Sequence, residues 1–175
     1  EFIRTNAAAD RWFLQIETFD PHEPFFTQQH YKDLYPHTYD GPQFDWPPYR
    51  RVEETPEQVQ HIRYEYAALV SMCDTYLGKV LDLMDELNLW QDTLLIVNTD
   101  HGFLLGEHDW WAKNLQPFYE EVAHPPLFIW DPRAPRPGAR CDALTQMIDM
   151  PATLLEFFGV PLPKDMLGVP LRAAL

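Results

Sequence analysis

The hydrophobic and polar positions along the chain form three short apolar runs and one long amphipathic stretch. The apolar runs cover Trp12–Phe19, Thr93–Thr99 and Pro126–Trp130, and each has the length of a strand. The first run is nearly continuous, which is typical of a buried strand in a parallel sheet. We therefore expect three strands, the first of them buried and parallel to its neighbours.

The amphipathic stretch predicts a long helix. Thr55 is a good N-cap, Pro56 suits the first helical turn, and Gln58 completes a capping box. Apolar or aromatic residues then recur at alternating spacings of three and four, which predicts one buried stripe: Val59, Ile62, Tyr66, Leu69, Cys73, Tyr76, Val80, Met84 and Leu87. A second, shorter helix is expected from Asp149 as N-cap to Gly159 as the residue after its C-cap.

The order strand, helix, strand, strand, helix predicts an α/β fold, as one part of a mostly parallel sheet flanked by helices. We expect a single partial domain over residues 1–175, with a tail over residues 160–175. Residues 25–54 are predicted to form a long loop whose aromatic side chains could stack on a sugar or aryl ring: Tyr31, Tyr35, Tyr39, Phe44, Trp46 and Tyr49.

Composition and charge exclude several classes. Hydrophobic residues make up 46% of the 175 residues, which argues against disorder. The formal net charge of −14 argues against a nucleic-acid partner. It also means that any anion site must be built locally, from a metal ion and a few cationic side chains. No apolar run is long enough to span a membrane, and the sequence does not indicate where the protein works.

Asp100 and His101 are the clearest candidate ligands. They follow the Thr93–Thr99 run, and ligands of open α/β sheets bind at the C-terminal ends of strands. A carboxylate and an imidazole can each offer a lone pair to one divalent cation, and Gly102 lets the chain turn away. From these residues alone, an N-cap aspartate beside a hydrogen-bonded histidine is an equal alternative.

Lys113, His22 and His108 are candidates for anion binding. Lys113 follows two tryptophans that can partly desolvate its charge. His22 lies between two prolines after the first predicted strand and could hydrogen-bond an ester oxygen. His108, seven residues past His101, could face the same site. The alternatives are a surface lysine beside core aromatics and solvated loop histidines.

The sequence offers no convincing nucleophile. Ser71 is the only serine and lies in the long predicted helix, and Cys73 is on the buried stripe of that helix. Cys141 lies in a turn far along the chain from the other candidates. An activated nucleophile needs a base or a metal beside it, and we expect none of these three to meet that condition.

Several of these segments, in chain order, resemble the sulfatase branch of the alkaline phosphatase superfamily over nearly the whole chain. The most specific match is the strand-end Asp100-His101-Gly102 with Lys113 twelve residues after the histidine. Further matches are a Pro-His-x-Pro-Phe turn, the long helix, a Gly-Glu-His stretch, the approach to the next strand, and the closing helix: Asp20–Phe25, Tyr66–Leu87, Gly106–His108, Glu120–Leu127 and Asp149–Gly159.

The resemblance implies roles for individual residues. Asp100 and His101 match two metal ligands. Lys113 matches a lysine that binds the sulfate group. His22 matches a histidine that contacts the sulfate or the bridging ester oxygen, as a candidate proton donor to the leaving group. The resemblance favours calcium, whereas on ligand type alone manganese or zinc is plausible. The implied substrate is a sulfate ester, such as a small sulfated molecule or a sulfated sugar.

One part of the family pattern is missing. Family members carry an earlier pair of metal-binding acids and a Cys/Ser-x-Pro-x-Arg motif whose first residue becomes formylglycine, and neither occurs here. We therefore expect a C-terminal part of the catalytic domain that needs the N-terminal part as its partner and has little or no activity alone. Two alternatives remain: a phosphoester or phosphonate-ester hydrolase of the same superfamily, and a non-catalytic metal-binding or interaction fragment.

Overall fold

The computed structural model describes residues 1–173, which divide into two compact units. The first unit comprises Glu1–Phe13, Met84–Asp100 and the described residues from Pro126 onward. The second unit comprises Leu14–Leu83 and His101–Pro125. All the residues proposed above for the anion site, His22, His108 and Lys113, belong to the second unit.

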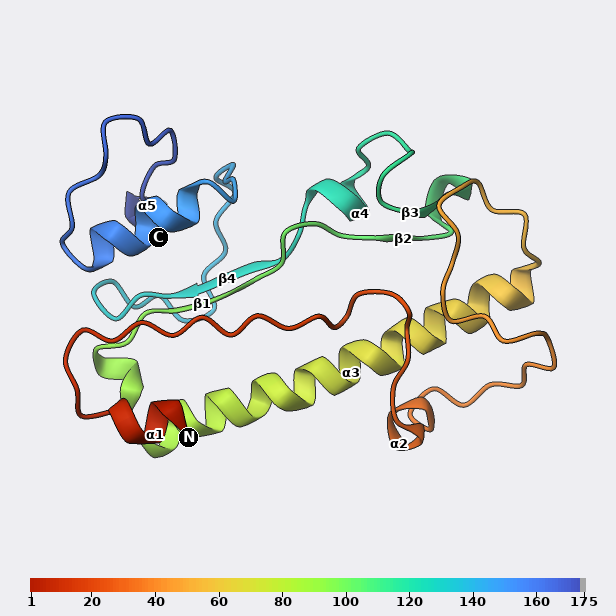
Figure 1. Cartoon of the computed structure of the whole chain (residues 1–175), viewed down its shortest axis with the longest axis horizontal. Coiled ribbons are helices and arrows are strands. Elements are labelled where there is room, and N and C mark those ends of the chain that lie inside the picture. Colours follow the sequence, from red (N-terminus) through yellow and green to blue (C-terminus); the bar gives the residue numbers. More distant parts are fainter. Residues whose placement is uncertain (174–175) are drawn as a thin grey trace. The chain divides into compact units, whose positions relative to one another are not determined.

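Helices and strands follow one another along the chain in a mixed α/β order (Figure 1). Among the described residues, no helix is long and apolar enough to cross a lipid bilayer. The elements are α1 (Phe2–Asn6), α2 (Gln29–Lys32), α3 (Pro56–Glu86), η1 (Leu89–Gln91), β1 (Leu95–Asn98), β2 (Leu104–Leu105), η2 (Glu107–Asp109), β3 (Trp111–Ala112), α4 (Glu120–Ala123), β4 (Leu127–Trp130), α5 (Asp149–Phe157) and η3 (Leu171–Ala173).

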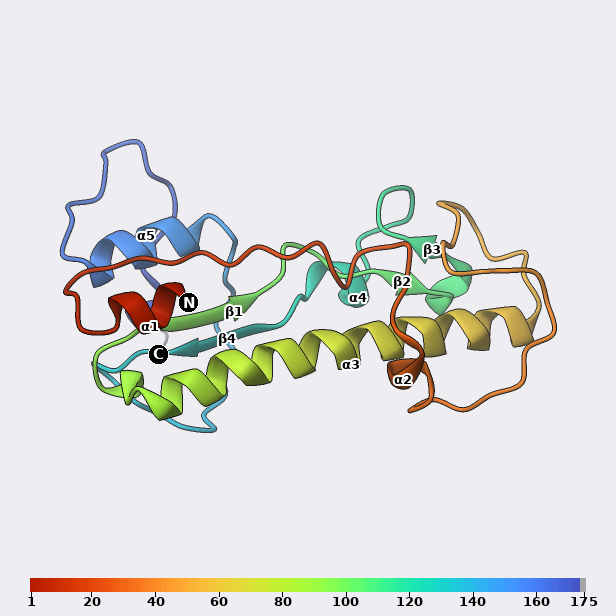
Figure 2. The ribbon, with the colours of Figure 1, turned by 60° about the horizontal axis from the view of Figure 1, so that its bottom comes forward.

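The first unit is built on an antiparallel pair of strands, β1 and β4, which lie side by side in both ribbon views (Figures 1 and 2). Ile96 pairs with Ile129, and the indole N–H of Trp130 donates to the carbonyl of Trp90 at 3.0 Å. The two predicted strands over these residues are therefore confirmed. Both strand pairs among the described residues are antiparallel. The expected parallel pairing of strands is therefore not seen in the part of the chain that the structure describes.

A buried ion pair also stabilises the first unit. Asp131, directly after β4, is 3% exposed and accepts hydrogen bonds from the Arg133 guanidinium at 2.9, 3.1 and 2.6 Å. Arg133 also pairs with Glu156 on α5 at 2.8 Å. Burial alone would raise the pKa of the Asp131 carboxyl. The hydrogen bonds and the charge of Arg133 outweigh burial and hold that pKa below its usual value.

The closing helix α5 ends as its sequence predicts. Gly159 has φ +68°, and its N–H donates to the carbonyl of Glu156 while that of Val160 donates to Leu155. This is a Schellman motif, which favours glycine. The prediction of Asp149 as N-cap is wrong, because Asp149 is the first helical residue. Its carboxylate instead accepts the backbone N–H groups of Gln146 and Val169, and these bonds draw the side chain inward.

The second unit is organised around α3, whose start confirms the predicted capping box. The backbone N–H of Thr55 donates to the Gln58 side chain at 3.0 Å, and the N–H of Gln58 donates to the Thr55 hydroxyl at 3.4 Å. Ile62 and Leu69 of the predicted stripe are fully buried. Tyr76 is 54% exposed and lies under the ammonium of Lys79, so the stripe does not continue there.

The predicted strand over Trp12–Phe19 does not form. The segment is extended but belongs to no strand (Figure 1). Three of its apolar side chains are exposed, with Phe13 at 53%, Ile16 at 59% and Phe19 at 68%. A strand depends on hydrogen bonds to a neighbouring strand, and no strand among the described residues pairs with this segment. The apolar run was therefore insufficient to predict a strand.

The core of the second unit holds both chain segments that carry the candidate anion site. Phe25, two residues after Glu23, is fully buried, with its ring 5.1 Å from that of Tyr66. Trp111 and Ala112 of β3, just before Lys113, are also fully buried. The buried Phe25 therefore anchors the segment that carries His22 and Glu23, and the buried Ala112 anchors the segment that carries Lys113.

Candidate functional site

Lys113 and His22 lie in direct contact. The ammonium nitrogen Nζ of Lys113 is 2.7 Å from Nε2 of His22, and the Lys113 side chain is 9% exposed. Ala112, the residue before Lys113, has φ +71°, a left-handed conformation that costs a residue other than glycine about 1–2 kcal/mol. The buried core holds this strained residue in place, and its conformation sets the direction in which Lys113 leaves β3.

The contacts of His22 assign its proton. Nδ1 lies 2.7 Å from the carbonyl oxygen of Glu23, which can only accept a hydrogen bond, so Nδ1 carries the proton. In the neutral ring Nε2 then has a lone pair. The ammonium of Lys113 donates to that lone pair. The Phe19 ring packs on the imidazole with centroids 4.6 Å apart.

Glu23 and Tyr49 complete the cluster. The Glu23 carboxylate is 2% exposed and lies 3.4 Å from Nζ of Lys113 and 3.3 Å from Nδ1 of His22. Its other oxygen accepts a short hydrogen bond from the Tyr49 hydroxyl. Burial alone would raise the pKa of this carboxyl. The hydrogen bonds and the neighbouring Lys113 and His22 outweigh burial and lower that pKa. Burial and Glu23 raise the pKa of Tyr49 to about 12, so the phenol stays a donor.

Sequence reasoning missed Glu23 and Tyr49. Glu23 was treated only as part of the turn, and Tyr49 only as one of several loop aromatics. The available signal was the position of Glu23 directly after the candidate His22. A lysine that is largely removed from water, such as Lys113, needs a nearby negative charge. No sequence signal indicated that Tyr49, 26 residues further on, would be its partner.

Asp100 and His101 follow β1. Asp100 ends the Met84–Asp100 segment of the first unit, and His101 begins the His101–Pro125 segment of the second. Asp100 is exposed and accepts from the Thr99 hydroxyl at 3.4 Å. His101 donates from Nδ1 to the carbonyl of Gly102 at 2.9 Å. Metal-ligating histidines commonly use one nitrogen in this way.

The donor types fit two positions of a divalent-metal shell, a carboxylate oxygen and an imidazole nitrogen. Among the described residues there is no group of three or more His, Cys, Asp or Glu side chains that could hold a metal ion.

His108 is placed in a cluster of its own. Its Nε2 is 3.2 Å from both carboxylate oxygens of Glu121, and its ring stacks on that of Tyr119 with centroids 3.9 Å apart. Its φ of +55° puts it in the left-handed region. The structure thus brings His22 and Lys113 together and gives His108 other partners.

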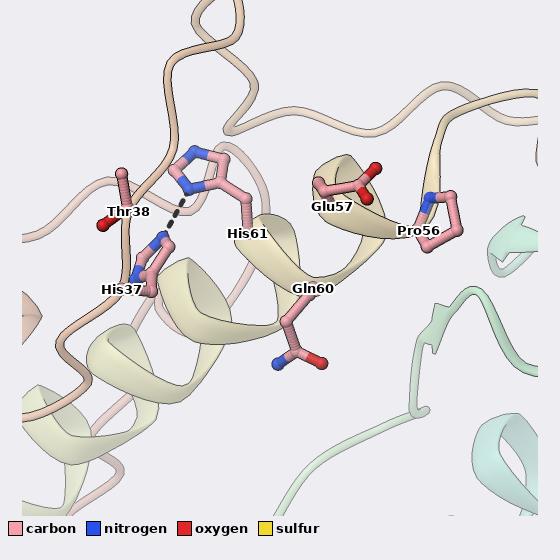
Figure 3. A pocket seen from close by; sticks show the side chains of 6 residues that line it. All are labelled: His37, Thr38, Pro56, Glu57, Gln60 and His61. Atoms are coloured by element: carbon pink, nitrogen blue, oxygen red, sulfur yellow. Dashed lines mark hydrogen bonds between the residues drawn. The ribbon is translucent and has the colours of Figure 1, made fainter.

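A cavity of about 280 Å³ lies at the start of α3 (Figure 3). Its lining includes His37 and His61, whose Nε2 and Nδ1 atoms are 2.8 Å apart. Burial lowers the pKa of His61, as does the neighbouring His37. None of the predicted site residues lines this cavity.

Comparison with known proteins identifies the family to which this chain belongs. The sulfatase family model matches residues 1–160. N-acetylglucosamine-6-O-sulfatase of Bacteroides thetaiotaomicron is 34% identical over 116 residues, which are 66% of this chain and 20% of that protein.

Two solved structures are similar in fold. The structure of BT4656 in complex with its substrate D-glucosamine-2-N,6-O-disulfate has 30% identity and a TM-score of 0.64, covering 70% of this chain and 25% of that one. The phosphonate monoester hydrolase SpPMH from Silicibacter pomeroyi has 35% identity and a TM-score of 0.63, covering 69% and 23%. These similarities confirm the α/β, alkaline phosphatase-like fold class.

The chain spans about a fifth to a quarter of the length of these relatives. The family model nevertheless covers most of the chain, including all the candidate site residues. The chain therefore belongs to the sulfatase family.

Proposed function

We propose that this chain carries part of the ester-binding site of a sulfuric ester hydrolase. Lys113 would bind the sulfate group, His22 would contact the sulfate or the bridging ester oxygen, and Asp100 and His101 would be two ligands of the metal ion. The observation that carries the proposal is the 2.7 Å contact between Lys113 and His22, which are 91 residues apart in the chain.

Lys113 suits an anion for physical reasons. An ammonium has three N–H donors. His22 and Glu23 take two of these, which leaves the third for a sulfate oxygen. Because the side chain is largely removed from water, its charge is weakly screened and acts strongly at short range. A local cation of this kind is what a chain with a net charge of −14 needs to bind an anion.

His22 would contact the sulfate or the bridging ester oxygen. When the ester S–O bond breaks, the leaving oxygen must gain a proton. In the arrangement described, Nζ of Lys113 bears the proton between the two residues and Nε2 of His22 accepts it. His22 can therefore protonate the leaving oxygen only after Nε2 has first gained a proton.

A metal ion held by Asp100 and His101 would neutralise charge on the sulfuryl oxygens. The two donors allow calcium, manganese or zinc, and membership of the sulfatase family favours calcium. Sulfated sugars are the proposed substrate class. This is supported by a relative named as an N-acetylglucosamine-6-O-sulfatase and by a similar structure solved with a disulfated glucosamine.

One observation favours a second candidate, a phosphonate monoester hydrolase. The solved structure with that name is 35% identical to this chain, slightly more than the sulfated-sugar complex at 30%. Both ester classes present an anionic centre that Lys113 could hold. Parallel assays of the complete protein with an aryl sulfate and an aryl phosphonate monoester would separate them.

We propose no nucleophile within these 175 residues. The hydroxyls of Ser71 and Tyr35 are hydrogen-bonded to each other at 2.8 Å. Burial raises the pKa of the Cys73 thiol, which makes it a poor nucleophile. Cys141 is exposed, in a segment without regular secondary structure. The chain alone is accordingly proposed to show no turnover of an aryl sulfate, even with added calcium; turnover above background would contradict this.

Sulfate binding by the chain tests the proposed site directly. Inorganic sulfate is titrated into ¹⁵N-labelled protein while amide shifts are followed by NMR. We expect shifts around residues 22 and 113, lost in Lys113→Met and weakened in His22→Gln. Lys79→Met, which removes an exposed lysine on α3, should bind like the wild type. Equal affinity in wild type and Lys113→Met would show that the site is elsewhere.

A further inference from the structure

Glu23 presents an electrostatic contradiction within the proposed anion site. Its carboxylate is 3.4 Å from Nζ of Lys113, the cation that would hold a sulfate, and at this range it would repel that anion. The carboxylate is 2% exposed, and burying a charge is costly unless it is paired and hydrogen-bonded. A buried carboxylate in such a place needs a reason.

Both carboxylate oxygens of Glu23 have partners, and the partners of one oxygen differ from those of the other. One carboxylate oxygen accepts from Tyr49, and the other faces Nζ of Lys113 and Nδ1 of His22. The backbone carbonyl of the same residue accepts from Nδ1 of His22 at 2.7 Å. One residue therefore contacts both members of the candidate site, and Tyr49 fixes its side chain from the opposite end.

We propose that Glu23 is a positioning residue that, held by Tyr49, keeps the ammonium of Lys113 directed at Nε2 of His22. Without this carboxylate, a lysine whose four-carbon stem has many rotamers would turn its charge toward water. Glu23 thus reduces the net charge of the site but fixes the direction of the remaining N–H donor of Lys113. The inference deepens the proposed function and rests on it.

The two possible roles of Glu23 predict opposite changes in sulfate affinity when the carboxylate is removed. If the carboxylate is a bystander, Glu23→Gln removes a repulsive charge and sulfate binds more tightly. If it is a positioning residue, the same change releases Lys113 and sulfate binds more weakly. We expect weakening by about tenfold, because the loss of this charge-assisted contact lets the ammonium turn away from the anion.

The experiment uses the full chain and inorganic sulfate as the probe. Affinity is measured for wild type, Glu23→Gln and Tyr49→Phe, with Glu17→Gln and Tyr76→Phe as matched controls at exposed positions. Tyr49→Phe keeps the charge of Glu23 and removes only its hydrogen bond, so we expect a smaller weakening. Glu23→Asp, which keeps the charge, should restore part of the affinity. Circular dichroism identifies any variant that fails to fold.

A second readout needs no sulfate. Nuclear Overhauser contacts between the Lys113 side-chain methylenes and the His22 ring report the geometry itself, and they should be present in the wild type and lost in Glu23→Gln. If wild type binds no sulfate but these contacts depend on Glu23, the positioning role stands and the proposed function fails. Contacts retained in folded Glu23→Gln, or sulfate binding that is unchanged or tighter, overturn the positioning role.

Discussion

The ammonium of Lys113 donates to Nε2 of His22 at 2.7 Å, and 91 residues separate the two in the chain. The buried neighbours Phe25 and Ala112 hold the two segments in place. The contact therefore depends on the core of the second unit as much as on the polar residues themselves.

Loss of the Lys113 charge is expected to destabilise the fold. Lys113→Met leaves the buried carboxylate of Glu23 without its cation, and breaking a buried pair in this way costs about 3–5 kcal/mol. Urea denaturation followed by fluorescence measures the change in the free energy of unfolding. The double variant Lys113→Met/Glu23→Gln should recover part of the loss, because no unpaired charge remains. A single variant as stable as wild type would show that Glu23 does not depend on Lys113.

Metal binding should depend on Asp100. Calorimetric titration of the chain with calcium is expected to give weak binding, with a dissociation constant of about 1 mM or weaker, because the two proposed ligands are fewer than the roughly six to eight that calcium takes. Asp100→Ala should abolish the signal, while Asp74→Ala on the exposed side of α3 should not. Repeating the titration with manganese and zinc ranks the metals. Unchanged binding in Asp100→Ala would remove Asp100 from the ligand set.

The stability of the first unit should fall in acid through Asp131. The folded pKa of this carboxyl is lowered from 3.8, so its pairing with Arg133 contributes fully above that pH. The contribution is lost as the pH falls through the lowered folded value. Unfolding free energies measured between pH 7 and pH 2 should therefore fall less steeply in Asp131→Asn than in wild type. Asp10→Asn makes the same charge change at an exposed position, and equal slopes for the two variants would refute the assignment.

Two glycines in the second unit should respond in opposite directions to alanine. A Cβ at Gly102 would lie 1.7 Å from the backbone oxygen of Glu121, whereas a Cβ at Gly78 on α3 meets nothing within 4 Å. Gly102→Ala is expected to lower the free energy of unfolding by about 2–3 kcal/mol. Gly78→Ala should raise it by about 0.5–1 kcal/mol, because alanine is the better helix former. Melting temperatures check both, and a stable Gly102→Ala would show that α4 can move aside.

The sequence predicted those parts whose signals are local. The capping box at Thr55 and Gln58 and the glycine after α5 satisfy backbone groups within a few residues, and both are confirmed. The run over Trp12–Phe19 failed because a strand needs a partner that may lie anywhere, and no local pattern supplies it. Family resemblance alone suggested one anion site for Lys113 and His22. Their direct contact and the Glu23–Tyr49 bond required the folded chain.

The close approach at Gly102 has a consequence for His101. The N–H of Gly102 donates to the carbonyl of Val122 at 3.0 Å, and there is no room for a side chain between the two backbones. The candidate ligand is thus anchored by main-chain atoms one residue away. Substitutions that change the side chains of α4 but keep its backbone path would leave the anchor of His101 in place. The side chains around this histidine can therefore change while the backbone beside it stays fixed.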